Sequence, residues 1–510
     1  MVAIKPLKRW RPRNVILGVA LAAAAGVGVF LLFFPPVIGV ADNGDFARVM
    51  RQAGLTHLDP RETYEQRYFH YAHTRYAFTD HAWGGYVSSH VILVNVAAWL
   101  GRIADGRVFD IRVLGACYLA LLLTALALIG RYLPAGRRRS AGGEAIVTAA
   151  ALAALVFVFA DVGYLAYFNS FFGEPYALVG MLLLAGAALA IAAADRPSGA
   201  MLALLAAAAF AVATSKIQNA PLGLAFALLF ARLFTLRRDR QWRLQASAGL
   251  AAVVLGSLAM LALAPDGLRH INLYQTVFYG ILKDSPSVSA DMRELGIPEK
   301  YAALAGTNYF QKDTAIPQDD PELRREVLEK LGHKDVLLYY LRHPDRLRQK
   351  LERAAENGVY IRPKYLGNYD REAGRPPGAL AWTFSGWSRL KPHLPHTLPW
   401  VTGFYSLYAL SLGICWMRLR SPRARLIAET LAAVALAGAF SFVVPVLGDG
   451  EADLAKHLFM FNVCSDMMIV SAIAAVAAAA VRLAGIRPAE RTTSPAAAVN
   501  TDAQKDRRSE

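Results

Sequence analysis

The chain has 510 residues, of which 55% are hydrophobic and 18% are charged, and its mean hydropathy is +0.31. A soluble protein carries about 25% charged residues. The composition therefore excludes a disulfide-rich secreted scaffold, a disordered chain and an ordinary cytosolic enzyme. Because apolar runs of about 20 residues recur along the chain, we predict an all-α polytopic membrane protein with about ten transmembrane helices.

The net charge of +16 does not indicate a nucleic-acid-binding protein. Most lysines and arginines lie in short clusters between apolar runs, which is the positive-inside pattern of a membrane protein. The three cysteines, Cys117, Cys415 and Cys464, are far apart and form no CxxC motif. They predict neither a disulfide framework nor a structural zinc site.

The first apolar run, 15–34, follows a basic stretch and precedes Pro35 and Pro36. A cleaved signal peptide is the alternative interpretation, since small residues follow at 39–41. The apolar core of a signal peptide is about 7–15 residues long, and this run is longer. We therefore expect an uncleaved first span that crosses from the cytoplasm to the periplasm.

The apolar stretch 87–103 decides the rest of the topology. If it spans the membrane, the arginine cluster at 131–139 and the later basic loops face outward, against the positive-inside rule. We therefore interpret 87–103 as a helix that lies along the outer surface of the membrane. The later spans are then expected at 110–130, 144–160, 176–194, 199–214, 219–235, 246–264, 398–416, 424–446 and 460–481.

This topology predicts a multi-pass protein of the bacterial inner membrane with both termini in the cytoplasm. The expected parts are a transmembrane module (1–264) with an acidic first periplasmic loop (35–109), a mostly helical periplasmic domain (265–397), C-terminal transmembrane helices (398–482) and a disordered cytoplasmic tail (483–510). The unusual polar segments then share the periplasmic face, as a site at a membrane surface requires. Those segments are 41–48, 161–175, 214–219, 265–397 and 448–457.

Two carboxylates, Asp42 and Asp45, follow the first span directly, with Arg48 one turn further on. Such a pair can hold a divalent metal, or one carboxylate can act as general base while the other tunes its pKa. The alternative is structural, because Asp-Asn-Gly is a turn sequence and Asp45 could cap a helix that begins at Phe46. The sequence leaves both interpretations open.

Further candidates lie at the ends of later spans. Asn169 and Glu174 are embedded in the aromatic segment 164–175, and interfacial aromatic residues are common in membrane proteins. A carboxylate that starts a span, as Glu174 does, must be paired or hydrated unless it serves the helix dipole. Lys216, which lies near Gln218 where another span ends, can snorkel to the headgroups or bind a lipid phosphate.

Near the C-terminus, Asp449, Asp453 and His457 repeat at every fourth position, with Lys456 beside His457. If this segment is helical, the three side chains line one face, which predicts a polar stripe leading into a span. A solvated surface helix is the alternative.

Metal and nucleotide motifs are weak or missing in the sequence. His70, His73, His81 and His90 fit no strong metal-ligand spacing, so no metal site is predicted from them. The sequence also contains no P-loop, no GxSxG and no HExxH. These observations argue against ATP hydrolysis, a serine hydrolase and a zinc protease, but not against an enzyme that uses an activated lipid donor.

The arrangement resembles a GT-C glycosyltransferase, the polytopic class that uses polyprenyl-phosphate sugars, and is closest to WsfD-type hexose transferases of glycan biosynthesis. The motifs that carry the resemblance are Asp-Asn-Gly-Asp-Phe-Ala-Arg (42–48), Tyr-Phe-Asn-Ser-Phe-Phe-Gly-Glu (167–174), Ser-Lys-Ile-Gln-Asn (215–219) and Asp-Gly-Glu-Ala-Asp-Leu-Ala-Lys-His (449–457). The first loop has DxxD rather than a strict DxD, and the oligosaccharyltransferase WWDYG is missing. The resemblance therefore implies no cofactor, and a divalent metal is not favoured.

The resemblance implies the transfer of a hexose-type sugar from a polyprenyl-phosphate donor to a cell-surface glycan or lipid-linked acceptor, within membrane lipids. It places the catalytic acid in the first loop without choosing between Asp42 and Asp45. The cations expected to bind the donor phosphate are Arg48, Lys216, Lys456 and His457. The residues expected to bind the sugar or the acceptor are Asn169, Glu174, Gln218, Asp449 and Asp453.

Two other classes of protein stay open. A lipid-linked glycan or solute transporter would carry polar residues and broken helices near the bilayer centre. Here the spans are mostly Ala, Leu and Val, and the ionisable residues gather at one end, which favours the enzyme. A scaffolding subunit of a glycan assembly complex is the third class.

Overall fold

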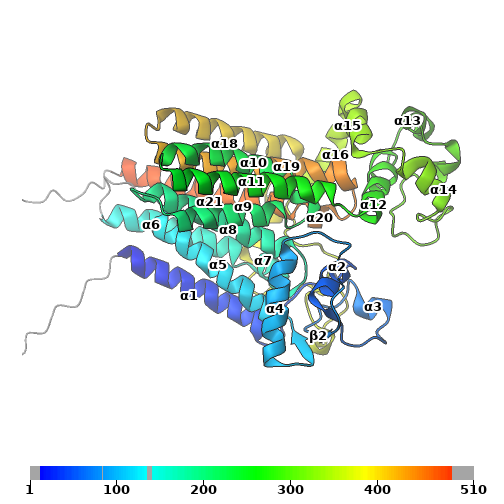
Figure 1. Cartoon of the computed structure of the whole chain (residues 1–510), viewed down its shortest axis with the longest axis horizontal. Helices are drawn as coiled ribbons and strands as arrows, with labels where there is room; N and C mark the ends of the chain where they lie inside the picture. Colours follow the sequence, from blue (N-terminus) through cyan, green and yellow to red (C-terminus); the bar gives the residue numbers. More distant parts are fainter. Residues whose placement is uncertain (1–11, 83, 135–140, 485–510) are drawn as a thin grey trace, which may run out of the picture.

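The structure, a computed structural model, describes residues 12–82, 84–134 and 141–484 (Figure 1). Eight helices of these residues are long and apolar enough to cross a membrane. They are α1 (Pro12–Phe33), α5 (Arg112–Tyr132), α6 (Ala141–Phe159), α8 (Glu174–Ala193), α11 (Arg240–Ala262), α18 (Leu398–Arg418), α19 (Pro422–Asp449) and α21 (Phe459–Leu483). The predicted all-α polytopic fold is confirmed.

Two shorter apolar helices, α9 (Gly199–Ala213) and α10 (Leu222–Leu236), lie alongside the long ones (Figure 1). Fifteen residues rise about 22 Å, less than the roughly 30 Å of hydrocarbon in a bilayer. Small residues let them pack closely, since a Cβ built on Gly180 of α8 would lie 2.9 Å from the side chain of Val212 in α9. The ten bundle helices overlap the ten ranges expected from the sequence, but among the described residues eight of them, not ten, are long and apolar enough to cross a membrane.

Helix α4 (His90–Ala104) runs across the direction of the bundle helices (Figure 1). It buries Val91, Val94 and Ala98 against the protein and exposes Ile92 and Trp99 on another side. An apolar face on a helix at the end of a bundle is typical of a helix that lies along a membrane surface. This is the orientation that the predicted surface helix requires.

The bundle has two different ends. Helix α1 begins and α21 finishes at one end, whereas the first loop and the segment 265–397 gather at the other, here called the loop end (Figure 1). The arginines at 137–139 and nearly all of the tail predicted to be disordered lie outside the described residues. The polar segments that carry the candidate site residues connect bundle helices at the loop end. They are 41–48, 161–175, 214–219 and 449–457.

The first loop forms a small antiparallel sheet that the sequence did not predict. Its strands, in the order β1-β2-β3, are β1 (Leu55–His57), β2 (Arg75–Phe78) and β3 (Val108–Asp110). Its helices are α2 (Phe46–Met50), η1 (Arg51–Ala53) and α3 (Tyr64–Arg67). In the register of β1 and β2, His57 pairs with Tyr76. Residues 58–74 therefore form a long connection that returns to the strand end at which His57 lies.

The segment 265–397 has two parts, of which the first packs around its own core, including Tyr274, Phe278 and Tyr340. Its helices are α12 (Asp266–Thr276), η4 (Val277–Ile281), α13 (Val288–Leu295), η5 (Glu299–Leu304), α14 (Pro321–Leu323), η6 (Arg324–Leu328), α15 (His333–Arg342) and α16 (Pro344–Asn357). The second part, 358–397, is mostly irregular and contains η7 (Arg371–Ala373), α17 (Gly386–Leu390) and η8 (Lys391–His393). It is fastened to the first loop, because the amides of Gly39 and Ala41 donate to the carbonyls of Asn368 and Gly367 at 3.0 and 2.9 Å.

Candidate functional site

Segments that are far apart in the sequence meet at the loop end of the bundle. They are the turn before α2, the start of α8, the short η3 (Ile217–Asn219) and the connection from α19 to α21 through α20 (Leu454–His457). We call the charged and polar side chains that they bring together the ionic cluster. Its members are Asp45, Arg48, Glu174, Lys216, Gln218, Asp449, Asp453, Lys456 and His457.

Asp42 is the residue that caps α2. Its Oδ1 accepts the backbone amides of Gly44 at 2.7 Å and Phe46 at 3.1 Å, and its side chain is buried. Gly44 makes this turn possible with φ +99°, which an L side chain adopts only with strain. Asp45 stands at the N-cap position before Phe46, as the structural alternative predicts, but its side chain makes no capping bond, and Asp42 accepts the amides instead.

Asp45 instead turns toward two cations. Arg48 Nη1 lies 3.0 Å from its Oδ1, and Lys456 Nζ donates to its Oδ2. Burial raises the pKa of the Asp45 carboxyl, but the charges of Lys456, Arg48 and Lys216 outweigh burial and hold that pKa well below its ordinary value. With a third of its side chain exposed, Asp45 is an ionised carboxylate within reach of solvent.

Lys456 lies behind Asp45 with only 1% of its side chain exposed. Its Nζ is 4.5 Å from the centre of the Phe172 ring. It is also 2.8 Å from the Asn43 amide, whose oxygen we assign to the Lys456 side because that orientation pairs both amide atoms and turns the nitrogen toward Asp45. Neither Asn43 nor Phe172 was selected as a site residue from the sequence, although both stand inside the motifs that were. The buried ammonium is therefore held by a carboxylate, an amide and an aromatic face.

Glu174 and Lys216 form a second ion pair in the cluster. Lys216 Nζ donates to Glu174 Oε1 at 2.7 Å, and the Glu174 side chain is 3% exposed. Glu174 Oε2 is buried without a hydrogen-bond partner. The carboxylate that begins α8 is thus paired, as its position at the start of a span requires.

His457 connects two further members of the cluster. Its Nδ1 lies 2.6 Å from Gln218 Oε1, and its Nε2 lies 3.1 Å from Asp449 Oδ2. Burial together with the positive charges of Lys216 and Lys456 lowers the pKa of His457 well below its ordinary value. His457 is therefore a neutral hydrogen-bonding group near pH 7 rather than the cation expected from the sequence.

The segment 449–457 is not one continuous helix, so the predicted stripe on a single helix face is wrong. Helix α19 ends at Asp449, Gly450 has φ +61°, and Asp453 has φ +47°. The turn folds the chain back on itself. Asp449 and His457 therefore meet across this turn, and not along one face of a helix. Burial, together with the Asp453 carboxylate, raises the pKa of Tyr365 in the segment 358–397, a residue that the sequence did not single out.

Asn169, expected from the sequence to bind the sugar or the acceptor, makes hydrogen bonds within the protein. It ends η2 (Ala166–Asn169), which follows α7 (Val162–Leu165), and its amide nitrogen donates to the carbonyls of Leu32 at 3.1 Å and Ile38 at 2.9 Å. Its side chain is buried. Asn169 thus fastens the end of α1 and the start of the first loop.

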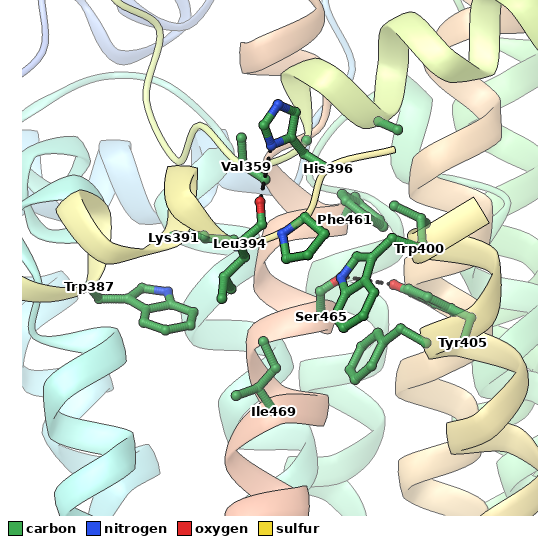
Figure 2. A pocket seen from close by; sticks show the side chains of 15 residues that line it. Val359, Trp387, Lys391, Leu394, His396, Trp400, Tyr405, Phe461, Ser465 and Ile469 are labelled. Atoms are coloured by element: carbon green, nitrogen blue, oxygen red, sulfur yellow. Dashed lines mark hydrogen bonds between the residues drawn. The ribbon is translucent and has the colours of Figure 1, made fainter. Parts of the chain in front are cut away.

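A separate buried charge pair lies between α7, α21 and the segment 358–397. Asp466 accepts hydrogen bonds from Tyr164 at 2.6 Å, Trp387 at 2.7 Å and Lys391 at 2.6 Å. A cavity of about 310 Å³ lies beside this pair, lined mainly by apolar and aromatic side chains (Figure 2). The lining includes Trp387, Lys391, Trp400, Tyr405, Phe461 and Ser465.

The comparison with known proteins agrees with this architecture. No curated protein matches the chain. The family model described as the YfdI N-terminal transmembrane domain matches residues 3–493, which is nearly the whole sequence. The chain therefore belongs to the YfdI N-terminal transmembrane domain family.

Proposed function

We propose that this protein is a membrane glycosyltransferase that moves a hexose-type sugar from a polyprenyl-phosphate donor to a cell-surface glycan or lipid-linked acceptor. One observation carries the proposal: the Asp45 carboxylate is accessible to solvent and held between Arg48 and Lys456. Family membership and the GT-C resemblance of the motifs at 42–48 and 449–457 support it.

In the proposed reaction, an acceptor hydroxyl attacks the anomeric carbon of the donor sugar. A bond forms between that oxygen and the anomeric carbon, while the bond from the anomeric carbon to the phosphate oxygen breaks. Asp45 takes the hydroxyl proton, and the electron pair of the broken bond stays on the polyprenyl phosphate. Arg48, Lys216 and Lys456 favour the negative charge that grows on the departing phosphate.

Binding of the donor would also make Asp45 a better base. In the free protein, Lys456, Arg48 and Lys216 keep the pKa of Asp45 low, which makes its carboxylate a weak proton acceptor. A donor phosphate that pairs with the same cations weakens their hold on Asp45 and lets its pKa rise. The acceptor proton is then taken only when the donor is bound.

The other members of the ionic cluster shape the site around these groups. Glu174 positions Lys216, while Gln218 and Asp449 hold the His457 ring through its two nitrogens. Asp453, which lies beside Tyr365, is the group we assign to the sugar or acceptor hydroxyls.

The finer parts of the proposal are a WsfD-type hexose specificity, a bacterial inner-membrane location and a periplasmic loop end. The described ends of α1 and α21 share the opposite end of the bundle, which is in keeping with both termini in the cytoplasm (Figure 1). The basic loop at 237–243 joins α10 to α11, and the one at 418–425 joins α18 to α19. Under the positive-inside rule these basic loops favour the cytoplasmic side, which supports a periplasmic position for the ionic cluster.

The test is mass spectrometry of surface glycans and lipid-linked intermediates. Cells with the wild-type protein, a deletion, Asp42→Asn or Asp45→Asn are compared at matched protein levels. We expect the deletion and Asp45→Asn to lose one hexose-sized unit. Asp42→Asn should keep most of the activity, because an asparagine oxygen can still accept the two backbone amides.

Asp59→Asn is the matched control, since Asp59 lies in the same loop with half of its side chain exposed. An intact sugar pattern in Asp45→Asn would remove the base assigned here. If the deletion instead makes lipid-linked precursors accumulate on one side of the membrane with their sugars complete, the protein is a transporter.

A further inference from the structure

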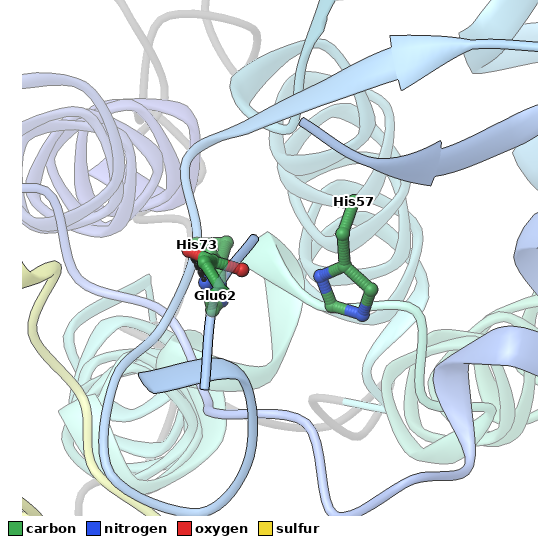
Figure 3. Close-up of side chains that lie close together, drawn as sticks. All are labelled: His57, Glu62 and His73. Atoms are coloured by element: carbon green, nitrogen blue, oxygen red, sulfur yellow. Dashed lines mark hydrogen bonds and ion pairs between the residues drawn. The ribbon is translucent and has the colours of Figure 1, made fainter. Parts of the chain in front are cut away.

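Three metal-ligating side chains that the proposed reaction does not use lie together in the first loop. They are His57 at the end of β1, His73 just before β2, and Glu62 between them (Figure 3). Each offers one ligand atom, and these atoms all lie within 4.8 Å of one another. The hairpin register explains the meeting, because His57 pairs with Tyr76 and the intervening residues return to the same place.

The polar atoms of this group are not satisfied by the protein. The His57 side chain is 9% exposed, and neither of its ring nitrogens has a hydrogen-bond partner. Glu62 Oε2 and His73 Nδ1 are also buried without a hydrogen bond. A Glu62–His73 ion pair, 3.0 Å between Oε1 and Nε2, accounts for two atoms of the group. Glu62 Oε2 lies 3.8 Å from Arg67 Nε and forms no hydrogen bond with it.

The surroundings extend this set by one carboxylate. Asp42 Oδ2 lies 3.6 Å from His57 Nε2 and has no hydrogen bond of its own. In Figure 3, the other nitrogen of His57, Nδ1, is turned toward Glu62 and His73. One ring therefore faces the His–Glu group with one nitrogen and Asp42 with the other, an arrangement common around metal-bound histidines.

We propose that His57, Glu62 and His73 bind a divalent transition metal, with Zn²⁺ as the expected ion and Asp42 as the outer partner of His57. Two imidazoles and one carboxylate suit Zn²⁺, whereas Mg²⁺ and Ca²⁺ prefer oxygen ligands alone. The bound ion takes one ligand atom from each of the three side chains. It ties both strand ends of the hairpin to Asp42, which caps the turn that carries Asp45.

The experiment measures metal on the full-length protein, purified in detergent through a histidine-free tag. The protein is stripped with a chelator, reloaded with Zn²⁺ and desalted, and its metal content is measured by mass spectrometry. We expect about one Zn²⁺ per chain in the wild type, as in a three-ligand site. The affinity should fall about tenfold or more in His57→Gln and His73→Gln.

His70→Gln is the matched control, because His70 lies in the same loop with a partly exposed side chain, and its Nδ1 lies 3.1 Å from the Glu65 carbonyl oxygen. It should keep the zinc. Thermal unfolding gives a second measurement: Zn²⁺ should raise the midpoint of the stripped wild type and of His70→Gln, and equimolar Mg²⁺ should not.

Glu62→Gln guards against variants that fail to fold, since it keeps the size of the side chain and removes only its charge. A monodisperse Glu62→Gln protein with weakened zinc binding supports the site. Zinc retained at the wild-type level in all three variants, or no zinc on the reloaded wild type, overturns the proposal. None of these measurements depends on the transferase, so they can fail or succeed apart from the proposed function.

Discussion

Two carboxylate–lysine pairs in this molecule have opposite surroundings. Asp466 is fully buried and accepts from Lys391, Tyr164 and Trp387, so each of its oxygens is used within the protein. Asp45 is a third exposed, and its two partners, Arg48 and Lys456, are both cations. A buried carboxylate whose oxygens are all hydrogen-bonded within the protein stabilises the fold. A solvent-accessible carboxylate between two cations leaves those cations able to pair with an anionic substrate.

The energetic consequences of the two pairs should also differ. Burial lowers the pKa of Lys391, and the Asp466 charge opposes that effect, so each charge depends on the other to remain in the interior. The Asp45 carboxylate keeps part of its hydration, which makes its pairing weak in stability terms. Substitutions should therefore separate the pairs, with loss of activity at Asp45 and loss of stability at Asp466.

The largest expected effect is on transfer by Asp45→Asn. The change removes the proton acceptor and keeps the shape of the side chain, and loss of a general base costs about 10²–10⁴-fold in rate. The rate is measured with purified protein in liposomes, with the polyprenyl-phosphate sugar as donor. The midpoint of thermal unfolding should fall less than in Asp466→Asn, because the Asp45 carboxylate is partly hydrated, although Lys456 is buried.

Asp59→Asn again serves as the control for a lost acidic charge in the same loop. A variant Asp45→Asn that is fully active but unfolds at a lower temperature would make Asp45 a structural residue like Asp466. The comparison on which the proposed function rests would then collapse.

The next effect is on stability, in Asp466→Asn. Removing one partner of a buried ion pair costs about 3–5 kcal/mol, because the other charge is left without compensation. The measurement is thermal or denaturant unfolding in detergent. The double variant Asp466→Asn with Lys391→Met should recover part of the loss, and an equally unstable double variant would show that the charge pair is not the cause.

The sequence predicts the positions of the helices around Asp45 and Asp466 better than the side-chain contacts between segments that are far apart in the chain. Periodicity and charge bias place the helices, and the alternation of loops puts 42–48, 174, 216–218 and 449–457 at one end of the bundle. The meeting of these segments therefore follows from topology alone. The pairing within them does not follow, since whether Asp42 or Asp45 caps α2 depends on a turn at Gly44.

The missed features have physical reasons as well. Strands of three or four residues, such as β1 and β2, are too short to show a two-residue period. The break at Gly450 replaces a helical repeat with a turn, and a regular spacing of polar residues cannot reveal it. Tyr365 reaches Asp453 only because the segment 358–397 is fastened to the first loop by backbone hydrogen bonds, which carry no sequence signature.

A smaller effect on stability is expected from Asn169→Ala, which sharpens the boundary of the site. The change leaves the carbonyls of Leu32 and Ile38 without a donor, and a buried group without its partner costs about 1–3 kcal/mol. Unfolding should shift while the KM for the donor stays at the wild-type value. A raised KM with unchanged stability would return Asn169 to the substrate site, where the sequence had placed it.

The smallest effect is on the pH dependence of transfer in Arg48→Gln. Because the pKa of Asp45 is lowered, its ion pairs are present above the ordinary pKa of the carboxyl and are lost only as the pH falls through the lowered value. Titration of Asp45 therefore does not limit the wild-type rate near neutral pH. Removing Arg48 lets the pKa of Asp45 rise and moves the acid side of the kcat profile toward neutral pH.

The pH at which the acid side of the profile turns should shift by less than about one unit, since a partly exposed ion pair is worth about 1 kcal/mol or less. The height of the profile should fall as well, because Arg48 favours the charge that grows on the departing phosphate, so the comparison is of the shape of the profile. The profile is measured with saturating donor, so that weaker binding of the phosphate does not enter. Arg51→Gln is the control, because Arg51 is exposed a few residues further on. If the acid side of the profile is the same in Arg48→Gln, in Arg51→Gln and in the wild type, another group takes the proton. The low pKa of Asp45 then reflects only its pairing with Lys456.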